Sequence, residues 1–340
     1  MKPKLFLLAI ISGMTWSSLA QIGGQSTYQF LNLPNSPKLS ALGGKNITSY
    51  SSDPANALAN PALINFEMHN QMSANYMNYF ADVNYGTASY AYDFGRRTQM
   101  IQAGVTYIDY GSFDGYDESG NSTLEFGGQE AAFSVGYARR LGRTDFYAGA
   151  NLKLISSKLE QYTSFAGALD LGISYIYSEW DLIVSGVVRN AGIQFEAFNE
   201  VREPLPFEVI LGISQTLKKA PIRWHITLEN LQEWNIAFRN TARDVEDLSG
   251  NVTPDDPGFI NNVLRHTILG AELFPDGGFS IQLGYNFRRG EELRIQDQRA
   301  FSGLTGGVSI RFNKVRFSYS YAQFNRAASS SFFGLMINLQ

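Results

Sequence analysis

The chain has 340 residues, no cysteine and a net charge of −4 at neutral pH. The lack of cysteine excludes a disulfide framework and a thiol nucleophile, and the mild negative charge argues against a nucleic-acid partner. Aromatic residues make up 14% of the chain and charged residues only 17%, and there are 32 glycines. This composition suits a lipid-embedded β-barrel with aromatic girdles, whose glycine-containing strands pack tightly against a plug.

Residues 1–20 predict a secretory signal peptide. Lys2 and Lys4 are followed by an apolar run over 5–14 and by small residues over 18–20, so cleavage is expected before Gln21. No other stretch approaches the roughly 20 apolar residues that a membrane-spanning helix needs. A membrane location must therefore come from strands.

The next segment, residues 21–66, carries helix signals in place of strand alternation. Ser36-Pro37, Asp53-Pro54 and Asn60-Pro61 each pair an N-cap residue with proline at the first helical position. They predict short helices over 37–42, 54–59 and 61–66, which cannot stand alone and are expected to plug the barrel. Gly43-Gly44 is interpreted as a helix cap, with a hinge as the alternative.

Residues 67–340 predict a transmembrane β-barrel of fourteen antiparallel strands. Ile222, Trp224 and Ile226 alternate with Arg223 and His225, and the other segments alternate similarly. Because arginine at the bilayer midplane costs about 2 to 4 kcal/mol, the charged face must be the lumen. A secreted β-sandwich or propeller is the alternative, but its strands are usually shorter. The candidate strands are 69–78, 83–94, 99–108, 129–141, 145–157, 162–177, 181–188, 207–215, 222–238, 266–274, 279–288, 301–311, 315–324 and 332–340.

The connections alternate in length, which orients the barrel. Outer-membrane barrels have short periplasmic turns and long external loops, and an even strand count returns the C-terminus to the periplasm. The long connections cover 109–128, 189–206, 239–265 and 289–300, and they are expected at the cell surface. Two links on that side, at 79–82 and 158–161, are short, so partner docking should favour the flank built by 189–206 and 239–265.

Several N-terminal stretches carry a family resemblance. They are Gly23-Gly24, residues 28–33 ("YQFLNL"), Ala41-Leu42-Gly43-Gly44, Asp53 and Asn60-Pro61-Ala62-Leu63. In this order at the head of a barrel they resemble the FadL-type outer-membrane barrels, and more narrowly the PorQ-type barrels of the type IX secretion system. The resemblance covers essentially the whole mature chain.

The resemblance implies a role in cell-surface assembly. Barrels of this type are taken to sit in the outer membrane of a Gram-negative bacterium, in an attachment complex with PorU-like, PorV-like and PorZ-like proteins, among membrane lipid and lipopolysaccharide. The barrel would anchor the PorZ-like surface protein and would not be an enzyme. The alternative is a FadL-like transporter of hydrophobic small molecules, which predicts an apolar pocket inside the lumen.

No catalytic, cofactor-binding or metal-binding residue is expected. His225 and Glu229 share one strand face about 13 Å apart, which is too far for direct contact. We therefore interpret them as polar lumen residues joined through water or plug backbone. The alternative is a hydrolytic site, whose activity His225→Ala would abolish.

Two external loops are expected to carry the surface partner. The first contains Asp114, Asp117 and Glu118. Two other interpretations of this loop are a site for a divalent cation, although the spacing is not that of an EF-hand, and a solvated acidic loop. The second contains Asp247, Asp255, Asp256 and Phe259, where apolar anchors favour a partner over disorder facing lipopolysaccharide sugars.

Overall fold

The structure is a computed structural model that describes residues 26–94, 99–115, 121–122, 125–199, 201–237, 245–246, 252–253, 257–293, 302–325 and 328–340. The expected signal peptide and the tight turn over 95–98 therefore lie outside the described residues. Among those that are described, no helix has the length and apolar character needed to cross a membrane.

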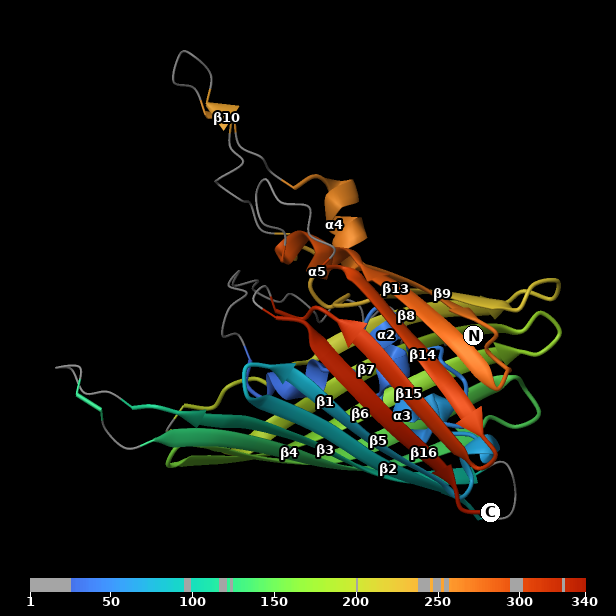
Figure 1. Cartoon of the computed structure of the whole chain (residues 1–340), viewed down its shortest axis with the longest axis horizontal. Helices are drawn as coiled ribbons and strands as arrows, with labels where there is room; N and C mark the ends of the chain where they lie inside the picture. Colours follow the sequence, from blue (N-terminus) through green and yellow to red (C-terminus); the bar gives the residue numbers. More distant parts are fainter. Residues whose placement is uncertain are drawn as a thin grey trace, which may run out of the picture.

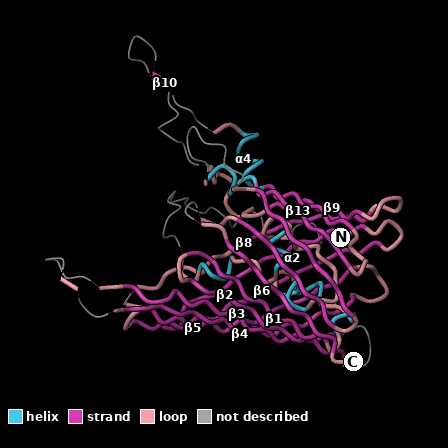
Figure 2. Tube along the Cα trace, viewed as in Figure 1, coloured by secondary structure: helices cyan, strands magenta, loops and turns pink. Residues whose placement is uncertain are grey.

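Fourteen antiparallel strands form a closed barrel, as predicted (Figures 1 and 2). Each strand pairs with its neighbours along the chain, and β1 pairs with β16 to close the wall. A separate two-stranded sheet, β10 (Val245–Glu246) with β11 (Val252–Thr253), lies in the connection between β9 and β12. The barrel strands are β1 (Gln71–Phe80), β2 (Val83–Asp93), β3 (Gln99–Phe113), β4 (Phe126–Arg140), β5 (Phe146–Leu159), β6 (Tyr162–Tyr177), β7 (Leu182–Glu196), β8 (Glu208–Thr216), β9 (Ile222–Leu228), β12 (Thr267–Leu273), β13 (Phe279–Asn286), β14 (Leu304–Phe312), β15 (Val315–Ala322) and β16 (Ser330–Asn338).

The wall alternates between buried and exposed residues, which confirms the predicted two faces. In β6, for example, Leu169, Leu171 and Ile173 face outward while Asp170 and Ser174 are buried in the lumen. Aromatic side chains also gather at the rim with short turns. Successive ring contacts there join Phe146, Tyr175, Tyr177 and Trp180, as expected at a membrane interface.

Several strand ends differ from the prediction. The strand predicted over 222–238 ends at Leu228, where Glu229 turns its carboxylate into an ion-pair network and Asn230 has a φ of 56°. Conversely, β3, β4 and β7 extend into segments assigned to loops, because their backbones keep pairing beyond the predicted ends. Local alternation cannot reveal how far a neighbouring strand continues.

The two longest external connections also contain helices that the sequence analysis missed. These are α4 (Phe259–His266) and α5 (Phe287–Glu292), which pack against each other at the outer end of β12 and β13 (Figure 1). The predicted strand start at 266 and strand end at 288 are therefore helical.

The N-terminal segment folds into short helices inside the barrel (Figure 1). They are η1 (Gln29–Asn32), α2 (Pro37–Ala41), α3 (Pro54–Ala57), η2 (Pro61–Leu63) and η3 (Phe66–Met68). The side chains of Ser36, Asp53 and Asn60 accept backbone N–H groups of the following turn. The helix predicted over 61–66 is instead two 3-10 turns, because Asn65 is extended and caps the second one.

Candidate functional site

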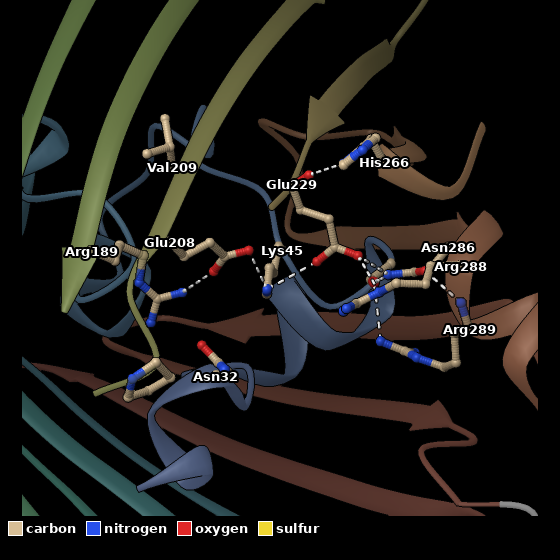
Figure 3. Close-up of polar contacts among 12 residues, drawn as sticks. Asn32, Lys45, Arg189, Glu208, Val209, Glu229, His266, Asn286, Arg288 and Arg289 are labelled. Atoms are coloured by element: carbon tan, nitrogen blue, oxygen red, sulfur yellow. Dashed lines mark hydrogen bonds and ion pairs between the residues drawn. The ribbon is translucent and has the colours of Figure 1, made fainter. Parts of the chain in front are cut away.

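The plug is held near the outer end of the lumen by Lys45. Its Nζ lies 2.6 Å from Glu208 Oε1 at the start of β8 and 2.9 Å from Glu229 Oε2 just after β9. Figure 3 shows the ammonium group between the two carboxylates. Both carboxylates are buried and Lys45 is only 11% exposed, so a plug cation balances two acidic groups that are shielded from water.

The same carboxylate also binds α5. Arg288 Nε lies 3.2 Å from Glu229 Oε1, and the side chain of Asn286 donates to the same oxygen over 3.3 Å. The neighbouring Arg289 donates to the carbonyl oxygen of Gly43 over 3.3 Å. Plug, wall and the external helix α5 are therefore joined in one polar network.

This network predicts a dependence of stability on pH. Burial raises the pKa of Glu229, but the charges of Arg288, Lys45 and Arg289 outweigh that effect and hold it at about 2, below the ordinary 4.5. Since the folded pKa is depressed, the contribution of Glu229 is complete above about pH 4.5 and is lost as pH falls toward 2. Thermal unfolding between pH 2 and 6 should show this loss, and Glu229→Gln should reduce the slope. An unchanged slope in that variant would contradict the assignment.

A second ion-pair cluster joins the plug helix α2 to the barrel wall. Lys38 Nζ lies 2.8 Å from Glu272 Oε1, and Arg223 Nη1 lies 3.5 Å from the other oxygen of that carboxylate. Lys38 belongs to α2, whereas Glu272 and Arg223 project from β12 and β9. The plug therefore contributes two buried lysines to acidic groups of the barrel wall.

His225 binds plug backbone. Its Nε2 lies 3.0 Å from the carbonyl oxygen of Leu42, and its Nδ1 lies 3.2 Å from the hydroxyl of Thr227. This geometry matches the expectation that inward polar residues of the wall meet the plug. Glu229 is engaged elsewhere, with Lys45 and Arg288.

Glycines in the wall make room for the plug backbone. A Cβ added to Gly284 of β13 would lie 2.2 Å from the backbone nitrogen of Gly43. One added to Gly149 of β5 would lie 2.4 Å from the carbonyl carbon of Pro61. At other inward glycines an added Cβ would meet a plug side chain, at 2.4 to 2.9 Å; these are Gly104, Gly172, Gly212, Gly307 and Gly334. The plug backbone therefore reaches the wall where a larger residue would clash with it.

Of the residues that carried the family resemblance, those over 41–44 and 60–63 lie at close contacts between plug and wall. Thr305 of β14 donates its hydroxyl to the carbonyl oxygen of Ala41 and accepts the N–H of Gly43. Asn60 donates to the carbonyl oxygen of Ile47 (2.7 Å) and to Ser174 of β6 (3.1 Å). The motif residues Ala41, Leu42, Gly43, Gly44, Asn60 and Pro61 thus lie where the plug meets the wall.

Gly43 and Gly44 follow the end of α2. Their φ angles are 94° and 99°, and the N–H of Gly44 donates to the carbonyl oxygen of Leu39 (2.9 Å). Only glycine adopts such angles without strain, so both residues fit a helix cap.

An apolar cluster occupies another part of the lumen. Tyr28, Phe30 and Leu31 of the plug pack among inward wall residues such as Tyr85 and Phe332. The Tyr28 hydroxyl also hydrogen-bonds Ser164 of β6. The lumen is therefore not wholly polar, and its apolar part is filled by the chain's own N-terminal segment.

The predicted partner-binding residues are only partly described. Asp114 is exposed after β3, and Phe259 is exposed at the start of α4. Asp117, Glu118, Asp247, Asp255 and Asp256 lie outside the described residues. Within the described ranges, no group of three or more His, Asp or Glu side chains is arranged to hold a metal ion.

Comparison with solved structures places the fold. The toluene transporter TbuX of Ralstonia pickettii aligns with 90% of this chain and 97% of its own, at 13% identity and a TM-score of 0.51. A deletion mutant of the TodX monoaromatic hydrocarbon channel aligns with 90% of this chain and 99% of its own, at 13% identity and a TM-score of 0.53. The fold is that of the FadL-like outer-membrane barrels. No protein-family model and no curated protein sequence matches the chain.

The FadL-like architecture explains where polar residues gather, but the plug contacts themselves were not predicted. Lys38 and Lys45 lie in a segment whose sequence pattern predicts only helix caps, and their partners are 163 or more residues away. Alternation indicated that Arg223, His225 and Glu229 point inward, but not which residues they meet.

Proposed function

We propose that this chain is a plugged outer-membrane barrel of the type IX secretion system that anchors a surface protein of the attachment complex. Two observations support the proposal. The motif residues Ala41, Leu42, Gly43, Asn60 and Pro61 lie at contacts between plug and wall. The external helix α4 turns an apolar face away from the barrel, and this face is the observation that carries the docking role.

The helix α4 buries its polar face and exposes its apolar face, the reverse of an ordinary surface helix. Its polar residues Asn262, Arg265 and His266 are buried, and His266 lies between the carbonyl oxygens of Glu229 (2.7 Å) and Trp234 (3.0 Å). Its apolar residues Phe259 and Ile260 are 71% and 73% exposed. An exposed apolar face held by buried polar contacts is typical of an interaction surface.

A surface protein is the occupant that fits this face. The helix lies at the outer end of the barrel, beyond the last residue of β9 (Figure 1). The preceding connection carries Asp244, Glu246, Asp247, Asp255 and Asp256. An apolar centre beside a strongly acidic segment favours a protein with an apolar pocket and a basic rim.

Replacing Phe259 by serine together with Ile260 by aspartate is expected to release the partner. Each side chain is an exposed anchor worth about 2 kcal/mol, and losing one such anchor weakens binding about thirtyfold. The measurement is recovery of the PorZ-like surface protein with the tagged barrel from native outer membranes, together with the amount of that protein on cells.

Leu217→Asp is the matched control because this exposed apolar residue lies in a periplasmic turn. It should leave recovery unchanged. Wild-type recovery in the double variant would contradict the proposal. If the double variant weakened only insertion into lipid vesicles, the face would contact the outer leaflet and the docking role would be wrong.

The second candidate function is transport of a hydrophobic small molecule. Its support is the fold shared with TbuX and TodX together with the apolar cluster around Phe30 and Tyr85. Transport would require Tyr28, Phe30 and Leu31 to leave that cluster. Uptake of radiolabelled toluene by cells, compared with cells lacking the chain, tests it, and equal uptake in both would exclude it for that substrate.

A further inference from the structure

A polar cavity of about 310 Å³ lies at the outer end of the lumen. Plug residues form one side, including Asn32 and Lys45, and α5 forms another with Arg288 and Arg289. Asn230, just after β9, also lines it. The cavity borders the apolar cluster through Leu33, Tyr79 and Phe324, but its polar lining is not explained by the anchoring role. Its volume is at the lower end of the range for small-molecule sites.

Among the described residues, three that line this cavity each have a buried side-chain polar atom without a hydrogen-bond partner. These atoms are Arg289 Nη1, Asn230 Nδ2 and Asn32 Oδ1. An unsatisfied buried polar group costs about 1 to 3 kcal/mol, so native proteins rarely leave several in one place. Two of the three are donors, which indicates a ligand that supplies acceptor oxygens.

The charges around the cavity favour an anion. Lys45 and Arg288 are already paired with Glu229, whereas the guanidinium of Arg289 donates to the carbonyl oxygen of Gly43 and lies 4.3 Å from the centre of the Phe324 ring. Three cationic side chains line the cavity against two acidic ones, Glu229 and Glu292. Stacking on Phe324 orients the planar guanidinium, whose parallel donors match carboxylate and phosphate oxygens.

We propose that this cavity binds a sugar-sized polar molecule that carries a carboxylate or phosphate group. The oxyanion accepts from Arg289 Nη1 and Asn230 Nδ2, and a hydroxyl of the same molecule donates to Asn32 Oδ1. The ligand contacts plug, α5 and the segment after β9 together, so its binding stabilises the plugged state by mass action.

Isothermal titration of the purified barrel in detergent tests the proposal with three probes: glucuronate, glucose 6-phosphate and glucose. We expect at least one anionic sugar to bind and neutral glucose to bind at least tenfold more weakly. Arg289→Gln and Asn230→Ala should each weaken the anionic sugar tenfold or more. Arg140→Gln, at an exposed ion pair on the periplasmic rim, is the matched control and should bind as wild type.

Thermal unfolding of each variant separates loss of the site from loss of the fold. Asn230→Ala keeps the test valid if Arg289→Gln loosens the plug, because Asn230 makes no contact with Gly43 among the contacts described. Lack of binding by both anionic sugars, equal binding of glucose, or wild-type affinity in both variants would overturn the proposal. If purified lipopolysaccharide competes with the anionic sugar, the natural ligand is a membrane headgroup. If lipopolysaccharide does not compete, the ligand is a soluble molecule. Both results support the site.

Discussion

Replacing Gly284 by alanine is expected to displace the plug from the barrel. The new methyl carbon would lie 2.2 Å from the backbone nitrogen of Gly43 and 2.4 Å from the carbonyl carbon of Leu42. The methyl group would lie between the backbone of β13 and the backbone of the plug, and neither can move as a flexible side chain would. We therefore expect a loss of about 3 kcal/mol in unfolding free energy. Limited proteolysis should then cut residues 26–66 faster, and ion conductance in planar bilayers should rise.

Gly306→Ala is the matched control for this prediction. Gly306 lies on the next strand, and its added Cβ would meet its nearest neighbour at 3.5 Å, an ordinary contact. It should retain wild-type protease resistance and conductance. Equal behaviour of the two variants would show that Gly284 does not set the space for the plug.

Replacing Lys45 by methionine is expected to destabilise the folded barrel by about 3 to 5 kcal/mol. The change removes the shared cation and leaves Glu208 and Glu229 buried near each other, and removing one partner of a buried pair has a cost of this size. Urea unfolding followed by tryptophan fluorescence measures it. Adding Glu208→Gln should restore part of the loss, because it removes one of the two buried carboxylates that shared the lysine.

The exposed pair Arg140–Asp145 supplies the comparison for Lys45. The two side chains are 39% and 44% exposed, so Arg140→Met should cost no more than about 1 kcal/mol. If Lys45→Met cost as little as Arg140→Met, the plug would not depend on its buried ion pairs.

The barrel was predictable because its signal is local. Alternation of Ile222, Trp224 and Ile226 with Arg223 and His225 gives the two faces of a strand without knowledge of any neighbour. The caps Ser36, Asp53 and Asn60 likewise act within one turn of their own helices. Fourteen strands and a helical N-terminal segment therefore follow from the sequence.

The plug contacts were not predictable because they join distant parts of the chain. Lys45 and Glu208 are 163 residues apart, and nothing near either residue specifies the other. The helix α4 was missed for a related reason. Its apolar residues point outward and its polar residues inward, so it lacks the partnered apolar face by which an amphipathic helix is normally recognised.

The main effect of the buried ion pairs is to fix the plug in a single position, and their net contribution to stability is secondary. Two plug lysines must each meet a particular carboxylate of the wall, and glycines admit the backbone at only certain sites. A plug fixed in this way suits a barrel that acts as an anchor, whereas a transporter must release it.

An engineered disulfide between plug and wall tests this account most directly. The chain has no cysteine, and a Cβ at Gly212 of β8 would lie 3.2 Å from Thr48 Cγ2 of the plug, where the sulfur of Thr48→Cys can reach the sulfur of Gly212→Cys. The side chain of Ile47, whose Cγ1 would lie 2.8 Å from the new Cβ, must shift to admit this bridge. The account predicts equal amounts of the surface protein on cells carrying the oxidised and the reduced variant. Loss of that protein on oxidation, with recovery on reduction, would show that the plug must move and would contradict it.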